Sequence, residues 1–191
     1  MMTDFHATAA TDTGTLIGTQ AGYRITSVTE VTDRDALDAL MLDYYGVLVE
    51  KLAAAGVPGG YTPSDLKASF WPNLHKILPP NGRFLLVHDA AGRLVGCASL
   101  QLAGVNRGEL KRLYIRPQAN GNGLGRMLVT AQMEAAKAMG WQTLLINIIK
   151  GNTESIRIFE ALGFRYIDRY PECFDPIELD PYFVYMQSDL T

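Results

Sequence analysis

The sequence contains little cysteine and histidine, which limits its options for disulfide and metal chemistry. Its 191 residues include two cysteines, Cys97 and Cys173, and three histidines. Neither cysteine belongs to a CxxC pair, and no histidine has a metal-like partner at helical or strand spacing. We therefore expect two reduced thiols and no metal site. Cys97 could be a nucleophile or a small buried strand residue, and we favour the buried residue.

The sequence also lacks a basic excess and a long apolar run. The net charge of −3 argues against general affinity for nucleic acid. No stretch reaches membrane-spanning length, and residues 1–20 lack the basic and apolar parts of a signal peptide. We expect no nucleic-acid partner, no membrane association and a cytoplasmic protein. We interpret 1–20 as a flexible tail and 21–191 as one domain.

Apolar patterning predicts strands and helices in the order β-α-α-β-β-β-α-β-α-β-β, which indicates an α/β fold. Pro72 should break or kink the second helix. Strands are expected over 23–28, 84–87, 94–102, 109–115, 143–149, 164–169 and 181–186, and helices over 33–55, 64–77, 124–139 and 152–162.

The most informative segment is a strand that runs into a glycine-rich loop and then into a helix. The strand over 109–115 ends before Pro117, and Gly121, Gly123 and Gly125 precede the helical pattern. The first N–H groups of a helix have no intrahelical partner, and glycine lets the backbone approach a bulky anion. The segment therefore predicts a phosphate-binding loop.

Two common phosphate loops do not fit this segment. A Walker loop needs a Gly-Lys-Ser/Thr ending, whereas this loop ends Leu124-Gly125-Arg126. A dinucleotide loop needs a small residue three positions after Gly123, where Arg126 stands, and it should follow the first strand of the fold.

The loop instead resembles the acetyl-CoA loop of the GNAT N-acetyltransferases, Arg/Gln-x-x-Gly-x-Gly/Ala. Gln118-x-x-Gly121-x-Gly123 matches it in full, and the register that starts at Asn120 matches except at that first position. A second segment, from Asn152 to Phe164, resembles the family's second CoA-contacting helix. Asn152 suits the N-cap of this helix, because its side chain can accept a hydrogen bond from an N–H of the first turn.

The resemblance implies a GNAT fold, with helices flanking a mixed central sheet that splays open at the acetyl-CoA strand. The exposed main chain of that strand, over 113–115, should pair with the pantetheine arm and supply N–H groups for the oxyanion near Ile115. The implied acetyl-CoA contacts are Leu113, Tyr114, Ile115, Gln118, Asn120, Gly121, Asn122, Gly123, Leu124, Gly125, Arg126, Asn152, Ser155 and Phe159. Arg116 is either a further phosphate contact or a solvated cation.

The resemblance also implies the catalytic groups. A glutamate near position 109 is the general base in the histone-acetylating branch, so Glu109 is our candidate, although an ion pair with Lys111 or Arg112 would equally explain it. Phe159 stands where relatives often carry a tyrosine that protonates the leaving thiolate. Four tyrosines are alternative donors, although core packing is the more frequent role of such residues: Tyr166, Tyr170, Tyr182 and Tyr185.

We therefore expect an acetyl-CoA-dependent transferase that acetylates a primary amine of a small molecule or peptide by direct transfer in a ternary complex. Acidic residues over 171–181 would attract a cationic amine, or are an ordinary solvated loop. Phe159 and Asn120 leave open a non-catalytic acyl-CoA sensor on the same fold. The apolar last strand is compatible with a homodimer.

Overall fold

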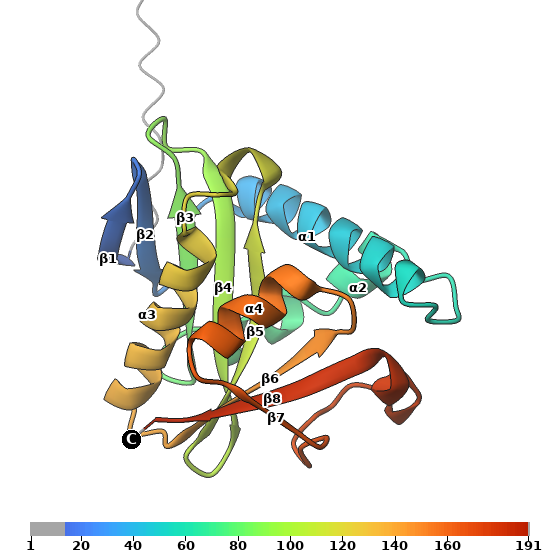
Figure 1. Cartoon of the computed structure of the whole chain (residues 1–191). Helices are drawn as coiled ribbons and strands as arrows, with labels where there is room; N and C mark the ends of the chain where they lie inside the picture. Colours follow the sequence, from blue (N-terminus) through green and yellow to red (C-terminus); the bar gives the residue numbers. More distant parts are fainter. Residues whose placement is uncertain (1–13, 191) are drawn as a thin grey trace, which may run out of the picture.

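The computed structural model describes residues 14–190, which form an eight-stranded mixed sheet flanked by helices (Figure 1). The strands are β1 (Gly14–Gln20), β2 (Tyr23–Val28), β3 (Gly82–His88), β4 (Leu94–Gly104), β5 (Arg107–Ile115), β6 (Thr143–Ile149), β7 (Arg165–Ile167) and β8 (Phe183–Asp189). The helices are α1 (Arg34–Ala54), α2 (Pro63–Lys67), α3 (Leu124–Ala138) and α4 (Thr153–Ala161), with 3₁₀ turns η1 (Trp71–Lys76), η2 (Pro117–Ala119) and η3 (Ile177–Tyr182).

The sheet opens between β5 and β6, its one parallel pair of neighbours among residues 14–190. The two strands pair only where Arg107–Glu109 faces Thr143–Leu145. From Leu110 onward β5 has no strand partner on that side, and Figure 1 shows β6 and β8 turning across the direction of β4 and β5. The predicted mixed and splayed sheet is confirmed.

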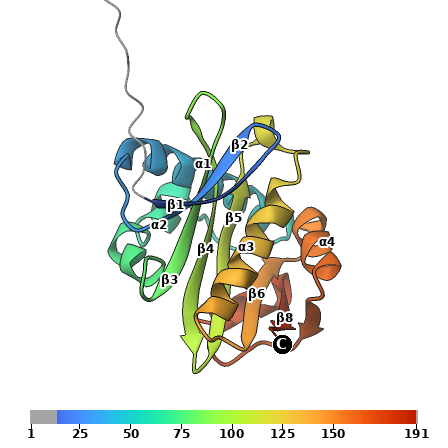
Figure 2. The same cartoon turned by 90° about the vertical axis from the view of Figure 1, so that its left-hand side faces the viewer.

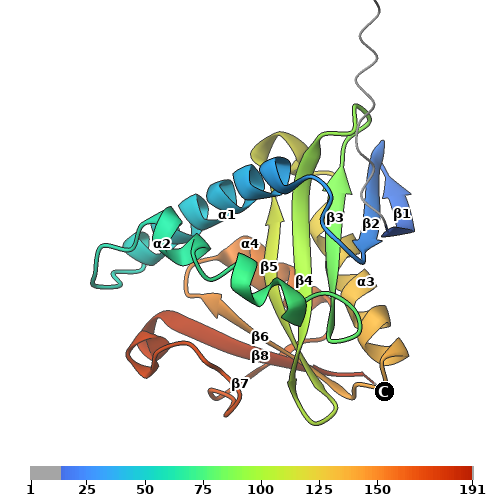
Figure 3. The ribbon, with the colours of Figure 1, turned by 180° about the vertical axis from the view of Figure 1, so that it is seen from behind.

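The helices cover the two faces of the sheet. Figure 1 shows α3 and α4 in front, and Figure 3 shows α1 and α2 on the opposite face. In the edge-on view of Figure 2, α3 lies along β4 and β5. Leu37, Leu40 and Met41 of α1 are fully buried against β3 and β4, while Val129 of α3 and Phe159 of α4 are buried on the other side. Burial of these apolar stripes stabilises the layers.

Local sequence signals explain the ends of α1. Asp33 caps the helix by accepting a hydrogen bond from the Ala36 N–H at 2.9 Å, and Gly56 follows its end at φ +82°. The predicted second helix over 64–77 is split into α2 and the 3₁₀ turn η1, which begins just before Pro72. Proline removes a backbone donor, so a break near this position is expected.

The predicted flexible tail over 1–20 is wrong for residues 14–20. These residues form β1, which pairs antiparallel with β2 around a turn at Ala21 and Gly22. The strand has few apolar residues and two glycines, so its sequence lacks the usual strand pattern. An edge strand can form with such a sequence because it needs little hydrophobic burial. Residues 1–13 lie outside the described part of the chain.

In the described part of the chain, no helix is long and apolar enough to cross a membrane.

Candidate functional site

The glycine loop between β5 and α3 presents free backbone donors. Gly121 and Gly123 adopt left-handed backbone conformations, at φ +80° and +72°. The N–H groups of residues 121–126 donate to no backbone carbonyl among residues 14–190. They lie at the N-terminus of the 15-residue helix α3, where the helix dipole favours negative charge.

Side chains hold this loop in shape from within and from β1. The Asn122 amide donates to the carbonyls of Ala119 at 3.0 Å and Asn120 at 3.2 Å. Gln20, the last residue of β1, donates to the carbonyl of Asn122, and a Cβ on Gly123 would collide with the Gln20 amide. The loop therefore needs glycine at position 123 for its left-handed conformation, and a side chain there would also displace the Gln20 amide.

The polar side chains that the sequence places near the loop have different roles. The Arg116 guanidinium is occupied by Asp43 of α1, at 2.8 Å and 2.7 Å, and by the Leu94 carbonyl. Arg116 therefore links α1 to the sheet. Because its guanidinium is already paired, the structure does not favour Arg116 as a phosphate contact. Gln118, Asn120 and Arg126 are solvent-exposed beside the loop.

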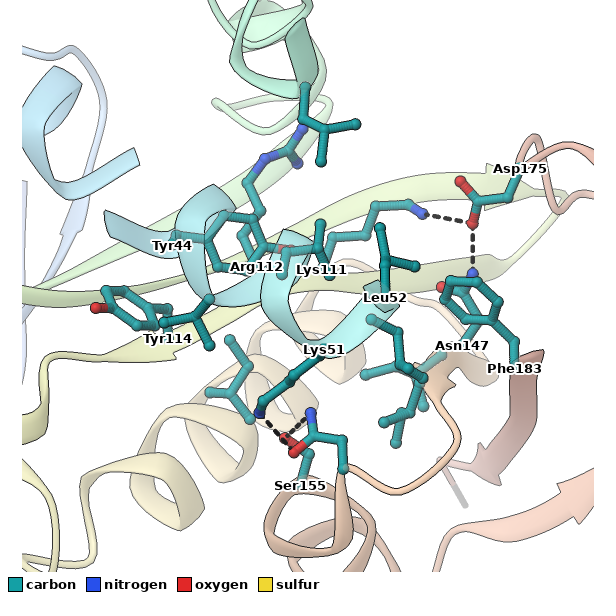
Figure 4. A pocket seen from close by; sticks show the side chains of 18 of the residues that line it. Tyr44, Lys51, Leu52, Lys111, Arg112, Tyr114, Asn147, Ser155, Asp175 and Phe183 are labelled. Atoms are coloured by element: carbon teal, nitrogen blue, oxygen red, sulfur yellow. Dashed lines mark hydrogen bonds and ion pairs between the residues drawn. The ribbon is translucent and has the colours of Figure 1, made fainter. Parts of the chain in front are cut away.

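The gap between β5 and β6 contains a cavity of about 420 Å³ (Figure 4). Of the predicted cofactor contacts, those that line it are Leu113, Tyr114, Asn152, Ser155 and Phe159. Ile115 and the loop residues lie outside its lining, directly beyond the end of the cavity-lining part of β5. The opposite wall comes from α1, with Tyr44, Leu48, Lys51 and Leu52, and from the Tyr61 loop.

A bulge in β5 turns two consecutive cations toward the cavity. Ser99 pairs with Lys111 and Cys97 pairs with Tyr114, so Arg112 and Leu113 together face one residue of β4. Arg112 lies at φ +56°, a backbone conformation that is strained for a residue with a side chain. Lys111 and Arg112 both belong to the cavity wall, as do the other residues of β5 from Leu110 to Tyr114.

Cys97, beneath this bulge, is a buried strand residue, as expected. It is fully buried, its Sγ lies 3.4 Å from the Arg112 carbonyl, and burial raises the pKa of its thiol to about 12. A neutral, enclosed thiol has little nucleophilic character.

Lys51 enters the cavity from α1 and reaches the start of α4. Its Nζ donates to Asn152 Oδ1 at 2.8 Å, and the Asn152 amide donates to Ser155 Oγ at 3.0 Å (Figure 4). The Asn152 side chain therefore does not cap α4 through a backbone N–H, although Asn152 occupies the N-cap position. Burial lowers the pKa of Lys51, and nearby Glu154 partly opposes this shift.

Glu109 lies behind the cavity wall rather than on it. Its side chain is 1% exposed and contacts three groups: the Tyr170 hydroxyl at 2.6 Å, the Gln101 amide at 3.0 Å and Lys111 Nζ at 3.0 Å. Burial, together with the charge of Glu109, raises the pKa of Tyr170. Lys111 also lies 3.9 Å from Asp175, a carboxylate that does line the cavity (Figure 4). Glu109 thus contacts the cavity only through Lys111.

None of the four candidate tyrosines lines the cavity. Tyr170 donates to Glu109, Tyr185 donates to Asp180 at 2.5 Å, and Tyr166 is exposed and donates to Glu160. Tyr182 packs in an apolar cluster with Leu52 and Ile149. The core-packing interpretation fits Tyr170 and Tyr185, which are buried in one cluster, and Tyr182. None of the four lies in the cavity wall, where it could protonate a thiolate.

The predicted acidic segment is mostly neutralised within the protein. Glu172 pairs with Arg107 at 2.6 Å, and Asp180 pairs with Arg169. Asp175 pairs with Lys111 and accepts from Asn147, and Glu178 is exposed. Of these four carboxylates, Asp175 is the one that lines the cavity.

The sequence did not single out Lys51 or the polar group formed by Lys111, Asn147 and Asp175. One signal was present for Lys51: with Tyr44, Leu48 and Leu52 it follows the spacing of one helix face, so it interrupts an apolar stripe. Asp175 and Asn147 come together only through the fold. Among residues 14–190 no group of three or more His, Cys, Asp or Glu side chains could hold a metal ion.

Comparisons with known proteins agree with this geometry. An uncharacterised N-acetyltransferase of Schizosaccharomyces pombe is 28% identical over 119 residues, which are 62% of this chain and 70% of the relative. The IAA acetyltransferase of Azospirillum brasilense is 30% identical over 119 residues, covering 62% and 74% of the two chains.

Solved structures share the fold. An acetyltransferase of Streptococcus agalactiae superposes with a TM-score of 0.67 at 19% identity, covering 88% of this chain and 99% of the other. The Salmonella typhimurium protein yncA, whose structure contains acetyl-CoA, gives 0.60 at 21% identity, with coverage of 89% and 95%. The profile of the Acetyltransferase (GNAT) family matches residues 48–164, which confirms the resemblance seen in the sequence. The chain belongs to the GNAT family of acetyltransferases.

Proposed function

We propose that the protein transfers the acetyl group of acetyl-CoA directly to a primary amine of a small molecule or peptide while both are bound. The observation that carries this proposal is the continuity of β5. One end of the strand lines a cavity between diverged strands, and the other leads into a loop of free N–H groups. A related fold binds acetyl-CoA in the Salmonella typhimurium protein.

The loop suits the diphosphate of CoA. Its six free N–H groups supply donors without side-chain charge, and exposed Arg126, Gln118 and Asn120 border it. The unpaired edge of β5 from Leu110 to Ile115 can accept the pantetheine arm as an added strand. Leu113, Tyr114 and Phe159 then provide the apolar walls around the thioester.

The attacking amine must lose a proton, and Asp175 and Glu109 are the carboxylates connected to the cavity. Asp175 faces it, while Glu109 is linked to it through Lys111. We retain Glu109 as the proposed final proton acceptor: Asp175 takes the proton of the amine, and Lys111 gives a proton to Glu109 and then takes the proton held by Asp175. Backbone N–H groups on the open edge of β5 would stabilise the oxyanion.

The departing thiolate needs a cation or an acid, and Phe159 has no proton to donate. Ser155 lies one helical turn before Phe159, and Lys51 is linked to it through Asn152. We propose that Lys51 takes over this task. Its lowered pKa makes the ammonium a better acid than an ordinary lysine.

We call the lining residues Tyr44, Tyr61, Lys111, Arg112 and Asp175 the acceptor end of the cavity. Figure 4 shows Lys111, Arg112 and Asp175 on the side away from Ser155 of α4. Their mixture of aromatic and charged groups suits a small amine-bearing molecule.

Release of free CoA thiol from acetyl-CoA across a panel of amines, antibiotics and peptides tests the function. Acceptor-dependent release would support the transferase. Calorimetric binding of acetyl-CoA with no release for any acceptor would favour the acyl-CoA sensor instead. Displacement of CoA by ATP would contradict both, because the loop has no phosphate-binding lysine.

A further inference from the structure

Arg112 is a cation of the cavity wall that has no carboxylate partner among the described residues. Its Nη1 donates to the Ser99 hydroxyl at 3.3 Å, and its guanidinium carbon lies 5.5 Å from the centre of the Phe70 ring. Its Nε is buried without a hydrogen-bond partner. Figure 4 draws no interaction from Arg112 to another lining side chain.

The neighbouring cations of β5 are compensated. Arg107 pairs with Glu172, and Lys111 pairs with Glu109 and Asp175. A guanidinium that keeps a buried, unpaired N–H next to an aromatic ring loses hydration without regaining a partner. Arg112 is therefore the cation of β5 for which a ligand can supply the missing anionic partner.

The backbone fixes Arg112 in the cavity wall. The bulge gives it a left-handed conformation at φ +56° and brings it to the same cavity as Lys111. Strained residues persist where the surroundings fix them, and they concentrate at ligand sites.

Charge balance at the acceptor end defines what the ligand should carry. Asp175 of the acceptor end and Glu109 behind it share the single positive charge of Lys111, which leaves one excess negative charge that an acceptor ammonium would balance. Arg112 contributes one positive charge, which a single carboxylate would balance in a bidentate pair. A phosphate ester carries nearly two negative charges, so it would leave an excess of negative charge at this end of the cavity.

Building on the proposed function, we propose that the acceptor is an amine that also carries a carboxylate, as in a free amino acid with an apolar side chain, and that Arg112 binds the carboxylate. Tyr44, Tyr61 and Leu66 supply apolar lining for the side chain. Asp175 and Lys111 would then lie near the amine.

The test compares amino acids with the amines obtained by removing their carboxylate. Leucine, phenylalanine and methionine are paired with isoamylamine, phenethylamine and methylthiopropylamine, and kcat and KM are measured by thiol release. For the wild type, kcat/KM should favour the amino acid of at least one pair. Arg112→Met should reduce that preference by about 10- to 100-fold, mainly through KM, while the paired amine changes little. Arg112→Lys should retain part of it, because a lysine keeps the charge but loses the bidentate geometry.

Controls separate this inference from folding and from the proposed function. Arg165→Met removes an exposed arginine of β7 that pairs with Asp189, far from the cavity lining, and should leave the preference unchanged. Acetyl-CoA affinity, measured by calorimetry, should be the same in Arg112→Met and wild type. Equal loss for amino acids and amines, turnover only of amines without a carboxylate, or no turnover of any pair would overturn the inference. Failure of the wild type to bind acetyl-CoA would instead reject the proposed function on which it rests.

Discussion

The glycine loop and the acceptor end of the cavity are built in opposite ways. The loop is one continuous stretch of chain that offers backbone N–H groups. The acceptor end combines side chains from α1, the Tyr61 loop, β5 and the segment around Asp175. Backbone donors bind one constant ligand whatever side chains surround them, whereas an assembly of side chains can change its ligand by single substitutions. This contrast explains how a family can keep one acetyl donor while its acceptors vary.

The largest effect is expected from Gly123→Leu. Position 123 has φ +72°, which strains a leucine backbone, and the new side chain would also displace the Gln20 amide from the Asn122 carbonyl, so the loop should lose its shape. The dissociation constant for acetyl-CoA, measured by calorimetry, should rise about 100-fold or more, equivalent to roughly 2.7 kcal/mol. Gly140→Leu is the matched control: Gly140 has φ +76° beyond the end of α3, and its Cβ would meet nothing within 4 Å. Unchanged affinity in Gly123→Leu would reject the loop assignment.

Lys51→Met tests a side chain of the cavity for which we propose a chemical role, in contrast to the backbone groups of the glycine loop. We expect kcat to fall by about 100-fold, the range typical of losing a general acid. A general acid must be protonated, so the wild-type rate should fall as pH rises through the pKa of Lys51. Burial lowers this pKa, so the decline should begin below the usual range of lysine and disappear in the variant. Lys137→Met, on the surface of α3, should change neither value. A wild-type alkaline limb that survives in Lys51→Met would exclude Lys51 from this role.

Glu109→Gln should have a smaller effect, and it should change both the stability and the reaction rate. The variant loses the charge that pairs with Lys111 and changes the hydrogen bond from Tyr170, so we expect a loss of about 1–3 kcal/mol in the free energy of unfolding. The rate should fall about tenfold at neutral pH and partly recover at high pH, where the amine loses its proton unaided. Glu172→Gln, which breaks the pair with Arg107 outside the cavity, should reduce stability without changing the pH–rate profile. If both variants keep the wild-type profile, Glu109 is structural.

The smallest predicted effect belongs to Gln20→Ala. Loss of the hydrogen bond from β1 to the Asn122 carbonyl should loosen the loop without removing any of its N–H groups. The dissociation constant for acetyl-CoA should rise only a few-fold, in keeping with about 1 kcal/mol for one hydrogen bond. A rise as large as that of Gly123→Leu would show that the loop depends on β1 for its shape, rather than on its own glycines.

The contrast between one continuous loop and a site assembled from several segments also decides what the sequence could predict. The strand, glycine loop and helix over 109–139 could be identified because each signal is local: apolar alternation, Pro117 and left-handed glycines. The splay of the sheet followed from the family resemblance. In contrast, Asp175 meets Asn147 and Lys111 only after three segments fold together, and no spacing in the sequence encodes that contact.

Two errors of detail have the same origin. Asn152 was expected to cap α4 with its side chain, but a lysine about 100 positions earlier engages it instead. Residues 14–20 were assigned to a tail because an edge strand needs few apolar residues, and its partner β2 supplies the pairing.

The most direct test of the account is whether the two regions act at the same time. Initial rates of thiol release should be measured while acetyl-CoA and an accepted amine are both varied. Direct transfer between two bound substrates predicts double-reciprocal lines that intersect, because the loop and the acceptor end are occupied together. Parallel lines, with acetyl transferred to the protein before the amine binds, would contradict the proposal that one cavity along β5 holds both substrates.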